Sequence, residues 1–539
     1  MEVKDLKDIP KTYNPQVVED KWYKYWEDNN LFHSEPDVSK ESYSIVIPPP
    51  NITGILTLGH ILNNSIQDIY IRYKRMQGFN TCWVPGTDHA SIATESKVVK
   101  YLQEQKINKY EVGREKFIQY CWNWKEKYGG LIIKQLRKLG VSCDWDRERF
   151  TMDSYYYKKV VETFVKLYKE GLIYRGRRMV NWCPASKSAI SEEEVIYKEV
   201  KSNLWFFKYP VKDSNEFVAV ATTRPETMLG DTGVAVNPDD SRYKHLIGKH
   251  AILPLVGREI PIFSDEYVDM EFGTGAVKVT PAHDVNDYEM GRKHNLEVIN
   301  IFNDDASTNA DVPDEFRNLD RYEARKLVIE KMTEEDLLEK IEDYTSNVGY
   351  SDRGGVPIEP YLSEQWFMRM KELAKPAIDV VKDGKVKFYP EHWVKTYEHW
   401  MSHIRDWCIS RQLWWGHRIP VWYHKETNQI YCGVDPPEDI ENWNQDEDVL
   451  DTWASSWLWA QDVFTTEKEQ AYYYPTNLLV TAPDIIFFWV ARMIIAGMKF
   501  MNNIPFEDVY FTSIIRDIKG RKMSKSLGNS PDPVDVIND

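Results

Sequence analysis

Two short segments near opposite ends of this 539-residue sequence carry residue types suited to phosphate chemistry. The first segment ends in Gly59-His60. A β-branched and aromatic run over residues 43–47 precedes it and predicts a buried strand. Apolar residues at helical spacing follow it as far as Gly78 and predict a helix. We therefore expect Gly59 and His60 in the first turn of a helix, where free N–H groups and the helix dipole favour an anion. The glycine lets a flat ring or a phosphate approach the backbone. The histidine can donate a hydrogen bond to charge that develops in a transition state.

The second segment, residues 520–529, holds three cations and two hydroxyl groups between two glycines. This composition suits a mobile loop that closes over a polyphosphate, with Lys522, Ser524 and Lys525 as candidate ligands. Taken alone, each segment also has an ordinary explanation. A Gly-His pair is common, and a loop rich in lysine and serine is usually solvated surface.

A carboxylate follows the next expected strand. Residues 81–84 complete a βαβ unit with the first strand and helix, and Asp88 comes just beyond them. Ligands of open parallel sheets lie beyond the carboxyl ends of the strands. Asp88 is thus a candidate partner for the ammonium group of an amino acid, and a turn or a helix cap is the alternative reading.

In this order the two segments resemble the signature motifs of class I aminoacyl-tRNA synthetases. The wording "PPPNITG" before Gly59 and "GRKMSKSLGN" near the end is most similar to the valyl family. The resemblance runs from about Lys11 to the last residue. It implies an α/β fold in which a Rossmann-like parallel sheet is split by a long connective insertion containing a β-rich editing domain. The implied activity joins valine to tRNA(Val) through valyl-adenylate and hydrolyses mischarged Thr-tRNA(Val).

The resemblance also assigns roles to individual residues. His60, Lys522 and Lys525 would stabilise the reacting phosphate, with Mg²⁺ arriving on ATP and no metal bound by the protein itself. The implied ATP contacts are Thr57, Gly59, His60, Asp484, Lys522, Ser524 and Lys525. The implied valine contacts are Pro48, Asn51, Asp88, Trp453, Ile485 and Trp489.

From about Leu204 the sequence changes to short strands with Gly/Pro turns, and two polar clusters lie within this stretch. By resemblance, Asp287 holds the amino group of a mischarged aminoacyl-adenosine, helped by Asp284. The implied pocket lining, which also orients water, is Thr222, Arg224, Thr227, Lys278 and Thr280. A second site is needed because an apolar pocket that fits valine cannot strongly reject threonine, an isostere that carries a hydroxyl. The valyl enzymes are a standard example.

The expected domain order follows from these motifs. Residues 1–40 form a helical arm, 41–150 the first half of the catalytic domain, 151–200 a linker, 201–345 the editing domain, 346–445 a return segment, 446–517 the second catalytic half, and 518–539 the loop and the start of a further region. Residues 314–344 are expected to be helical. In the second half we expect strands at 478–480 and 509–514 with a helix over 485–498 between them.

Composition limits the alternatives. The net charge is −16, so contacts with tRNA need local basic patches. The six cysteines are scattered without a CxxC pair, which suits a reducing cytosol. Cys183, Cys432 and His424 are candidate remnants of a zinc knuckle, although unliganded thiols are the favoured reading. The charged first residues indicate no signal peptide, and Pro483 and Arg492 interrupt the one membrane-like run. We expect a cytoplasmic monomer.

Some positions depart from the family pattern. They are Thr57 in place of a histidine, Ser91, Glu95, Ala482-Pro483 and Thr512-Ser513. The sequence also ends at Asp539, where family members continue into a helical anticodon-binding domain, so we expect adenylate formation to suffer less than tRNA charging. The departures at Thr57, Ala482-Pro483 and Thr512-Ser513, together with the end at Asp539, motivate the rival hypothesis of a synthetase-like paralogue without ligase activity. It would act as a trans-editing deacylase or as a protein that binds tRNA or an amino acid.

Overall fold

The computed structural model describes residues 12, 14–523 and 527–538, which fall into two compact units. Unit 1 comprises Met1–Ile173, Met368–Ile409 and Leu413–Asp539, and unit 2 comprises Tyr174–Phe367 and Ser410–Gln412. Unit 2 therefore extends beyond residues 201–345 at both ends. Within the described residues, no helix is long and apolar enough to cross a membrane.

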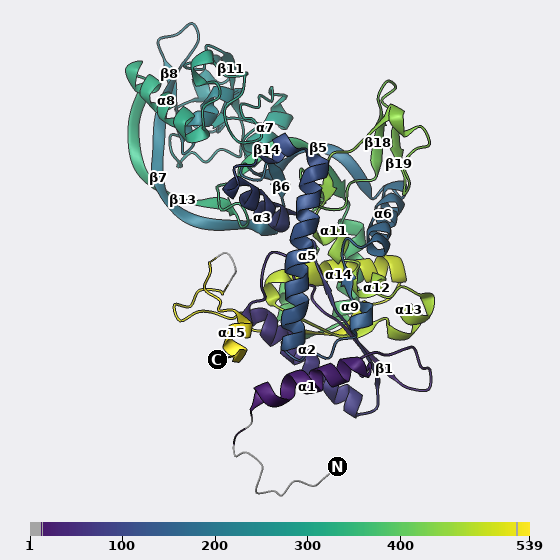
Figure 1. The fold of residues 1–539 in the computed structure, drawn as a ribbon. Helices are drawn as coiled ribbons and strands as arrows, with labels where there is room; N and C mark the ends of the chain where they lie inside the picture. Colours follow the sequence, from purple (N-terminus) through teal and green to yellow (C-terminus); the bar gives the residue numbers. More distant parts are fainter. Residues whose placement is uncertain (1–11, 13, 524–526, 539) are drawn as a thin grey trace, which may run out of the picture. The chain divides into compact units, whose positions relative to one another are not determined.

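Unit 1 is built on a five-stranded sheet in the order β15-β23-β22-β1-β2, in which every neighbouring pair is parallel (Figure 1). Its strands are β1 (Ser42–Val46), β2 (Asn80–Val84), β15 (Lys387–Tyr389), β22 (Thr476–Thr481) and β23 (Phe506–Phe511). The strands come from three distant parts of the chain, and the long segment of unit 2 is inserted between β2 and β15. The predicted α/β class with a divided parallel sheet is confirmed.

The predicted strand–helix–strand unit at the first motif is present. β1 pairs with β2 from Ser42↔Asn80 to Val46↔Val84, and α2 (Leu58–Met76) connects them. In the second half the last strand lies at 506–511 rather than 509–514. The connection before it is a π-helix over Ile486–Val490 followed by α14 (Ala491–Ala496).

Helices surround this sheet. They are α1 (Pro15–Asp28), α3 (Ser91–Glu104), α4 (Lys109–Val112), α5 (Arg114–Lys138), α6 (Ser154–Lys169), α9 (Lys371–Lys382), α10 (Trp393–Ser402), α11 (Trp453–Ser456), α12 (Trp459–Asp462), α13 (Glu467–Tyr473) and α15 (Pro533–Asn538). Small pairings add β3 (Gly86–Thr87) with β4 (Arg149–Phe150), and β18 (Val421–His424) with β19 (Ile430–Cys432) and β20 (Trp443–Gln445). The longest helix is α5, with 25 residues (Figure 1).

Unit 2 is mostly antiparallel β-structure, as predicted for the inserted segment. Its elements are β5 (Ile173–Cys183), β6 (Ser188–Ile190), β7 (Val195–Pro210), β8 (Phe217–Thr222), β9 (Gly233–Val236), β10 (His250–Ile252), β11 (Glu259–Ser264), β12 (Ala276–Val279), β13 (Leu338–Ser351), β14 (Glu359–Met368), α7 (Val285–His294) and α8 (Arg321–Glu334). One apolar core joins β7, β8, β9 and β11 to α8 through Phe207, Val220, Val234, Ile262 and Met332.

The prediction of helix throughout 314–344 is wrong at its end. The helix α8 stops at Glu334, and β13 begins at Leu338. β13 pairs antiparallel with β7 as far as Ser351↔Val195, and Figure 1 shows the two as long, curved, neighbouring strands. Charged residues with high helix propensity occupy this strand, because the long pairing with β7 outweighs their local preference.

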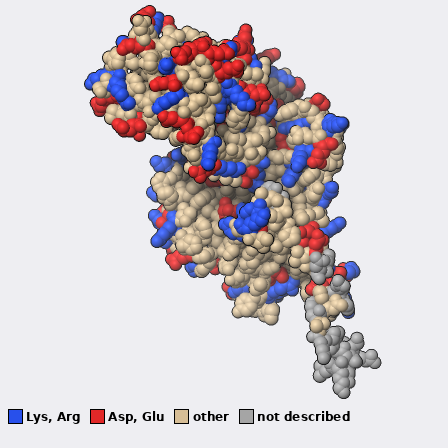
Figure 2. Space-filling view, turned by 90° about the vertical axis from the view of Figure 1, so that its left-hand side faces the viewer, with Lys and Arg blue, Asp and Glu red and all other residues tan. Residues whose placement is uncertain are grey.

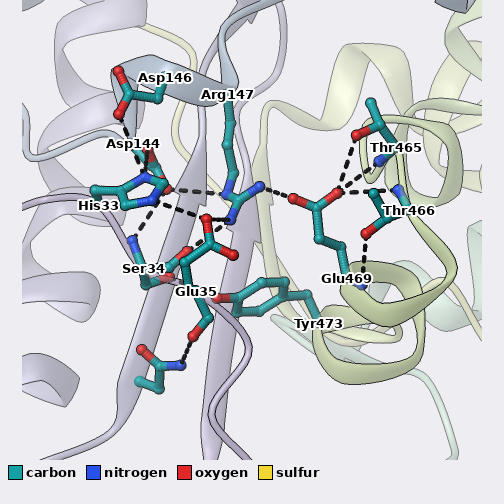
Figure 3. A network of polar contacts seen from close by, with 11 residues as sticks. His33, Ser34, Glu35, Asp144, Asp146, Arg147, Thr465, Thr466, Glu469 and Tyr473 are labelled. Carbon is teal, nitrogen blue, oxygen red and sulfur yellow. Dashed lines mark hydrogen bonds and ion pairs between the residues drawn. The ribbon is translucent and has the colours of Figure 1, made fainter.

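A polar network fastens the segment after α1 to the body of unit 1 (Figure 3). His33 lies 3.0 Å from the Asp144 carboxylate through Nδ1 and 3.1 Å from the Glu35 carboxylate through Nε2. Arg147 donates to Asp144 and to the backbone carbonyl of Ser34 and forms an ion pair with Glu469. These carboxylates raise the pKa of His33, so the charged imidazolium suits the position.

On the face shown in Figure 2, basic and acidic side chains are interspersed. The whole chain has a net charge of −16, and on this face the acidic side chains do not form one uninterrupted block. Local groups of Lys and Arg stand out among the acidic side chains on this face.

Candidate functional site

The first candidate site lies where β1 and β2 end. Asp88 donates its backbone N–H to the carbonyl of Pro50 at 3.0 Å and accepts from the N–H of Ile52 at 3.2 Å. Asn51 and Asp88 therefore form a parallel bridge that continues the pairing of the two strands. The fold brings these two predicted valine contacts side by side at the carboxyl edge of the sheet, where ligands bind in such folds.

The turn that carries Asp88 is tightly packed. A Cβ on Gly86 would lie 2.5 Å from both the carbonyl oxygen of Arg149 and the ring of Trp459, so only glycine fits there. Ala90 has a φ of 47°, in the left-handed region that costs energy for a residue with a Cβ. The Asp88 carboxylate accepts the N–H of Ala90 at 2.6 Å and so holds this conformation in place.

The Asp88 carboxylate is buried, with 3% of the residue exposed. Its second oxygen accepts the hydroxyl of Ser456 at 2.8 Å, and Trp489 donates its indole N–H to the backbone carbonyl of Ser456 at 2.9 Å. Burial raises the pKa of Asp88 to about 6, against the lowering effect of the Ala90 and Ser456 hydrogen bonds. A buried carboxylate with neutral partners is electrically unbalanced, and an ammonium group would supply the missing charge.

The two tryptophans predicted for the valine pocket are linked to Asp88 through Ser456 and its short helix α11. Trp489 reaches Asp88 through Ser456, and Trp453, which opens the short helix containing Ser456, stacks on Phe488 with ring centroids 5.2 Å apart. Trp489 is buried, whereas Pro48, Trp453 and Ile485 are half-buried. Ile485 directly precedes the π-helix that carries Trp489. Local π-helical turns frequently occur at functional sites.

The Thr57–His60 turn fixes the tautomer of the predicted catalytic histidine. Thr57 donates its backbone N–H to Nδ1 of His60 at 3.0 Å, and its hydroxyl lies 2.7 Å from the same nitrogen. Because an amide can only donate, Nδ1 is an acceptor and the neutral ring carries its hydrogen on Nε2. A Cβ on Gly59 would meet only the Thr57 hydroxyl, at 3.7 Å, so the protein itself does not require glycine there. Close approach of a ligand is the remaining reason.

The loop segment is folded back on itself around Asp517. The Asp517 carboxylate accepts the N–H groups of Lys519 and Arg521 and the side chains of Arg521 and Asn529, and these donors hold its pKa below the ordinary range. Lys522 forms an ion pair with Asp484. Two residues predicted to contact different parts of ATP therefore contact each other. Ser524 and Lys525 lie outside the described residues.

Two departures from the family pattern have partners of their own. Glu95 accepts the backbone N–H groups of Trp414 and Trp415 at 2.8 and 2.9 Å and forms an ion pair with Lys109. The Ser91 hydroxyl lies 2.9 Å from Nε2 of His89. Both side chains thus stabilise the first turns of α3, the helix that follows Asp88 in the chain. The charge that Glu95 brings into the interior is balanced by Lys109.

The second candidate site lies inside unit 2, around the Lys278 ammonium group. Lys278 donates to the hydroxyl groups of Thr227 at 3.0 Å and Thr280 at 2.6 Å, and to the carboxylate of Asp231 at 3.0 Å. Asp231 also accepts the hydroxyl groups of Thr280 at 2.6 Å and Tyr209 at 2.8 Å. The structure thus brings together three predicted residues, Thr227, Lys278 and Thr280.

The two acidic residues of this site have different surroundings. Asp284 caps α7 by accepting the N–H groups of Asn286 and Asp287. Asp287 is buried, with 8% of the residue exposed, and one oxygen accepts the N–H of Thr280 at 2.8 Å. Burial and the charge of Asp284 raise the pKa of Asp287. Asp287 is thereby directly linked to the Thr227–Lys278–Thr280 group.

Thr222 and Arg224 make contacts that shape the turn after β8. The Thr222 hydroxyl accepts the N–H of Arg224 at 3.0 Å. The Arg224 guanidinium donates to the carbonyl of His283 at 2.9 Å and forms an ion pair with Glu359. Arg224 therefore connects the two polar clusters of the sequence, which are residues 222–227 and residues 273–284.

Sequence analysis missed several partners of these residues. Ser456 lies 368 positions from Asp88, and Asp231 lies 47 positions from Lys278. The buried Tyr209 and Glu359 are also distant in sequence from the residues they support. The motifs themselves contain no signal for these contacts. The run Gly230-Asp231-Thr232-Gly233 before an apolar strand was the one available hint of a buried acidic turn.

One group of three metal-ligating side chains occurs among the described residues, and it consists of His33, Asp144 and Asp146. The hydrogen bond between His33 and Asp144, the ion pair between His33 and Asp146 at 3.6 Å and the Arg147 guanidinium beside Asp144 account for this arrangement. Cys183, Cys432 and His424 are not part of it. His424 instead accepts the backbone N–H groups of Glu426 and Thr427 through Nδ1.

Comparison with known proteins agrees with this geometry. The profile described as "tRNA synthetases class I (I, L, M and V)" matches residues 21–439 and 437–539. Similar curated relatives, each named "Valine--tRNA ligase", come from Bacillus licheniformis (55% identity over 98% of this chain and 61% of the relative), Parabacteroides distasonis (54%, 98% and 62%) and Geobacillus stearothermophilus (54%, 98% and 61%). The chain therefore spans about three fifths of the length of the curated relatives it matches.

A solved structure has a similar fold. It is a LeuRS of Agrobacterium radiobacter K84 in a ternary complex with tRNA and LeuAMS. The likeness has a TM-score of 0.53 and 17% identity and covers 98% of this chain and 71% of the other. At this identity it concerns the fold alone. The profile, which matches nearly the whole sequence, shows that the chain belongs to the class I tRNA synthetases.

Proposed function

We propose that this chain is the catalytic and editing part of a valine--tRNA ligase. The observation that carries the proposal is the 55% identity, over 98% of the chain, with a relative of that name. The geometry of unit 1 supports it, because a buried carboxylate beside bulky aromatic residues suits a small apolar amino acid with a free ammonium group. The reactants are valine, ATP with its Mg²⁺, and tRNA(Val).

In the first step a carboxylate oxygen of valine attacks the α-phosphorus of ATP. A new P–O bond forms, the bond to the bridging oxygen breaks, and pyrophosphate leaves with the electron pair. Asp88 and Asn51 hold the polar end of valine, while Pro48, Trp453, Ile485 and Trp489 enclose its side chain. Bulky walls leave room for valine but not for isoleucine.

The protein stabilises charge on the reacting phosphate rather than forming a covalent bond to it. His60 donates from Nε2, the nitrogen that the Thr57 contact leaves protonated. Lys522 and Lys525 bind the departing pyrophosphate. Thr57, Gly59 and Ser524 contact the nucleotide. Asp484 binds its ribose hydroxyls once Lys522 leaves the present ion pair.

In the second step the terminal ribose hydroxyl of tRNA attacks the carbonyl carbon of valyl-adenylate. AMP leaves with the electron pair, and the hydroxyl proton goes to solvent. When threonine has been attached instead, unit 2 hydrolyses the ester. Water adds to the carbonyl carbon, and the ribose oxygen leaves and takes a proton. Asp287 and Asp284 hold the ammonium group, and the polar residues around Lys278 orient the water.

We place this reaction in the cytoplasm and expect the chain to act as a monomer. All six cysteines are free thiols, which suits a reducing compartment. The mixed charge on the face shown in Figure 2 leaves tRNA to be held by local basic groups.

The test is pyrophosphate exchange into ATP, measured on the purified chain with valine, isoleucine or threonine. We expect valine-dependent exchange, much weaker exchange with isoleucine and weak exchange with threonine. His60→Ala should lower the valine rate by about 100-fold, because a donor to the transition state is lost. The control variant His392→Ala, at a position far along the sequence from the motif, should match the parent. Absence of exchange at millimolar valine and ATP would contradict the ligase proposal and favour a paralogue that only hydrolyses or binds.

A further inference from the structure

We propose that Asp231 is a positioning residue of the hydrolytic site. It fixes the hydroxyl group of Thr280 as a hydrogen-bond acceptor toward a ligand, beside Thr227, whose hydroxyl the Arg224 carbonyl fixes in the same sense. This polarity selects an ester whose amino acid carries a hydroxyl group. The inference rests on the proposed editing function and adds the residue that sets the polarity of its site.

The first step of the argument is the surroundings of Asp231. Its side chain is 0% exposed, and its Oδ1 lies 3.0 Å from the Lys278 ammonium nitrogen and 2.6 Å from the Thr280 hydroxyl. Its Oδ2 accepts the Tyr209 hydroxyl at 2.8 Å. An ionised carboxylate has no hydrogen to give, so each of these neighbours must act as the donor. Asp231 thus determines the direction of every hydrogen bond around it.

The second step concerns Lys278. An ammonium group has three N–H bonds, and here they go to Thr227 at 3.0 Å, Thr280 at 2.6 Å and Asp231. All three donors are used within the protein. Lys278 therefore acts on a substrate through its two threonine neighbours and through its charge, rather than by a hydrogen bond of its own.

The third step follows the two hydroxyl hydrogens. Thr227 donates its hydrogen to the backbone carbonyl of Arg224 at 3.0 Å, and a carbonyl can only accept. Thr280 donates its hydrogen to Asp231. Each hydroxyl oxygen also accepts one N–H of Lys278, which leaves it one lone pair. Both hydroxyls can therefore offer only an acceptor to a ligand.

A site that offers acceptors distinguishes threonine from valine. The β-hydroxyl of a threonyl ester can donate to such an oxygen, and so can a water molecule, whose own lone pair then stays available for attack on the ester. A methyl group of valine cannot donate and would leave a buried acceptor unpaired. Sites built to bond a substrate hydroxyl reject the analogue without it strongly.

The same residues connect to the ammonium-binding carboxylate. The backbone N–H of Thr280 donates to Asp287 at 2.8 Å, so Thr280 is held by Asp231 on one side and holds Asp287 on the other. The charged groups that act on Asp287 are Asp284, Lys278 and Asp231. Loss of the Asp231 charge would lower the pKa of Asp287, since Asp231 is one of the groups that raise it.

The test compares the parent chain with Asp231→Asn on two substrates, the 3′-threonyl and 3′-valyl esters of adenosine, which need no tRNA. The amide that this substitution introduces can donate to the Thr280 oxygen, so the hydrogen of the Thr280 hydroxyl is released and that hydroxyl is no longer fixed as an acceptor. We expect kcat on the threonyl ester to fall by about 10- to 100-fold, with KM changed less than about threefold, and the threonyl/valyl ratio of kcat/KM to fall by about tenfold. The acid limb of the pH profile should move to lower pH.

Four further variants separate positioning from folding. Asp239→Asn, at an exposed position of the same unit, is the matched control and should equal the parent. Thr280→Ser keeps the hydroxyl and should retain activity, whereas Thr280→Val should not. Tyr209→Phe removes one donor to Asp231 and should give a smaller loss of the same kind. If Asp231→Asn does not fold, Tyr209→Phe is used in its place.

The outcomes are distinct. Loss of the threonyl/valyl preference together with the lower acid limb supports the inference. Equal losses on both esters with an unmoved acid limb would assign Asp231 a purely structural role and overturn it. Full activity and preference in Asp231→Asn would also overturn it while the editing proposal stands. A parent chain that hydrolyses neither ester would overturn the editing proposal and this inference with it.

Discussion

Unit 1 and unit 2 each contain a buried carboxylate with a raised pKa, but the two differ in what surrounds them. Asp88 has neutral partners, the Ala90 N–H and the Ser456 hydroxyl, and Trp489 stands behind Ser456. Asp287 lies beside a second acid, Asp284, and next to a group of hydroxyls and an ammonium. Both carboxylates suit an ammonium group, so their surroundings must decide which side chain each site accepts.

The difference shows how one chain can apply two criteria to the same pair of amino acids. Around Asp88 the walls are apolar and aromatic, and such walls discriminate by size. In the proposed valine site they would exclude isoleucine but tolerate threonine, which has nearly the volume of valine. Around Asp287 the polar groups discriminate by hydrogen bonding, which is the property in which threonine and valine differ. The two proposed sites are therefore complementary, because one would select by the size of the side chain and the other by its hydrogen bonding.

The largest effects are expected when the two carboxylates are exchanged for neutral residues. Asp88→Asn should lower valine-dependent exchange by about 100- to 1000-fold, because the ammonium of valine loses its buried partner, and should leave ester hydrolysis unchanged. Asp287→Ala should do the reverse, with hydrolysis of the threonyl ester falling while exchange is retained. Exposed Asp383→Asn in unit 1 is the control for Asp88. If either variant lost both activities, the division of labour between the units would be wrong.

The next largest effect is expected in the loop after β23. This loop belongs to unit 1, so its variants should affect exchange and not ester hydrolysis. Lys525→Ala and Lys522→Ala should each lower the exchange rate by about 100-fold or more, because positive charge on the departing pyrophosphate is lost. Valine binding and hydrolysis of the threonyl ester should survive. Lys519→Ala, just outside the motif, is the control. Equal loss of valine binding and exchange rate would show that the loop has another role.

Sequence reasoning succeeded where a motif and its local structure coincide. The β1–α2–β2 unit was predictable because the apolar periodicity lies within the motif itself, and Asp88 was predictable because it follows a strand. The division of the sheet by an insertion followed from the resemblance. Strand β13 was not predictable, since its residues favour a helix and only the distant β7 makes them a strand.

The residues that support the two sites could not be predicted from the sequence, for the same reason. The Ser456 contact to Asp88 exists only after α11 has folded onto the sheet, and nothing in the sequence around Ser456 marks it as polar support. Asp231 meets Lys278 only because β9 and β12 pair. Glu95 looked like a defect in a motif, whereas Lys109 and two backbone N–H groups compensate for it. Long-range pairing, rather than local pattern, determines each of these contacts.

A smaller effect is expected when the Ser456 hydroxyl, one of the neutral partners of Asp88, is removed. The Ser456 hydroxyl stabilises the ionised form of Asp88, so Ser456→Ala should raise the pKa of Asp88 above its present value of about 6. Valine binding needs the carboxylate, and kcat/KM for exchange should therefore fall off at a higher pH than in the parent. At pH 7 we expect a loss of a few-fold. Ser39→Ala, in an exposed turn, should leave the profile unchanged. An unshifted acid limb would show that Asp88 is not the titrating group.

Asp144 is a third buried carboxylate, and it has cationic partners from the chain itself, Arg147 and His33 (Figure 3). It is therefore a structural counterpart to Asp88 and Asp287, and its effect should appear in stability alone. The pKa of His33 is raised in the folded state, chiefly by Asp144. Its contribution is thus fully present below the unfolded pKa of about 6.5 and is lost as the pH rises through the folded pKa.

Breaking this contact should give the smallest effect of all. His33→Gln should lower the midpoint of thermal unfolding of unit 1 at pH 5.5 but hardly at pH 8.5, by an amount equivalent to about 0.5 kcal/mol, since the His33 side chain is 29% exposed and solvent screens the pair. Valine exchange at pH 8.5 and ester hydrolysis should be unaffected, because the network contains none of the residues proposed to bind a substrate. His392→Gln, a histidine of the same unit without a carboxylate contact among the described residues, is the matched control. A difference that grows with pH would mean that the neutral imidazole, rather than the imidazolium, holds Asp144 in place.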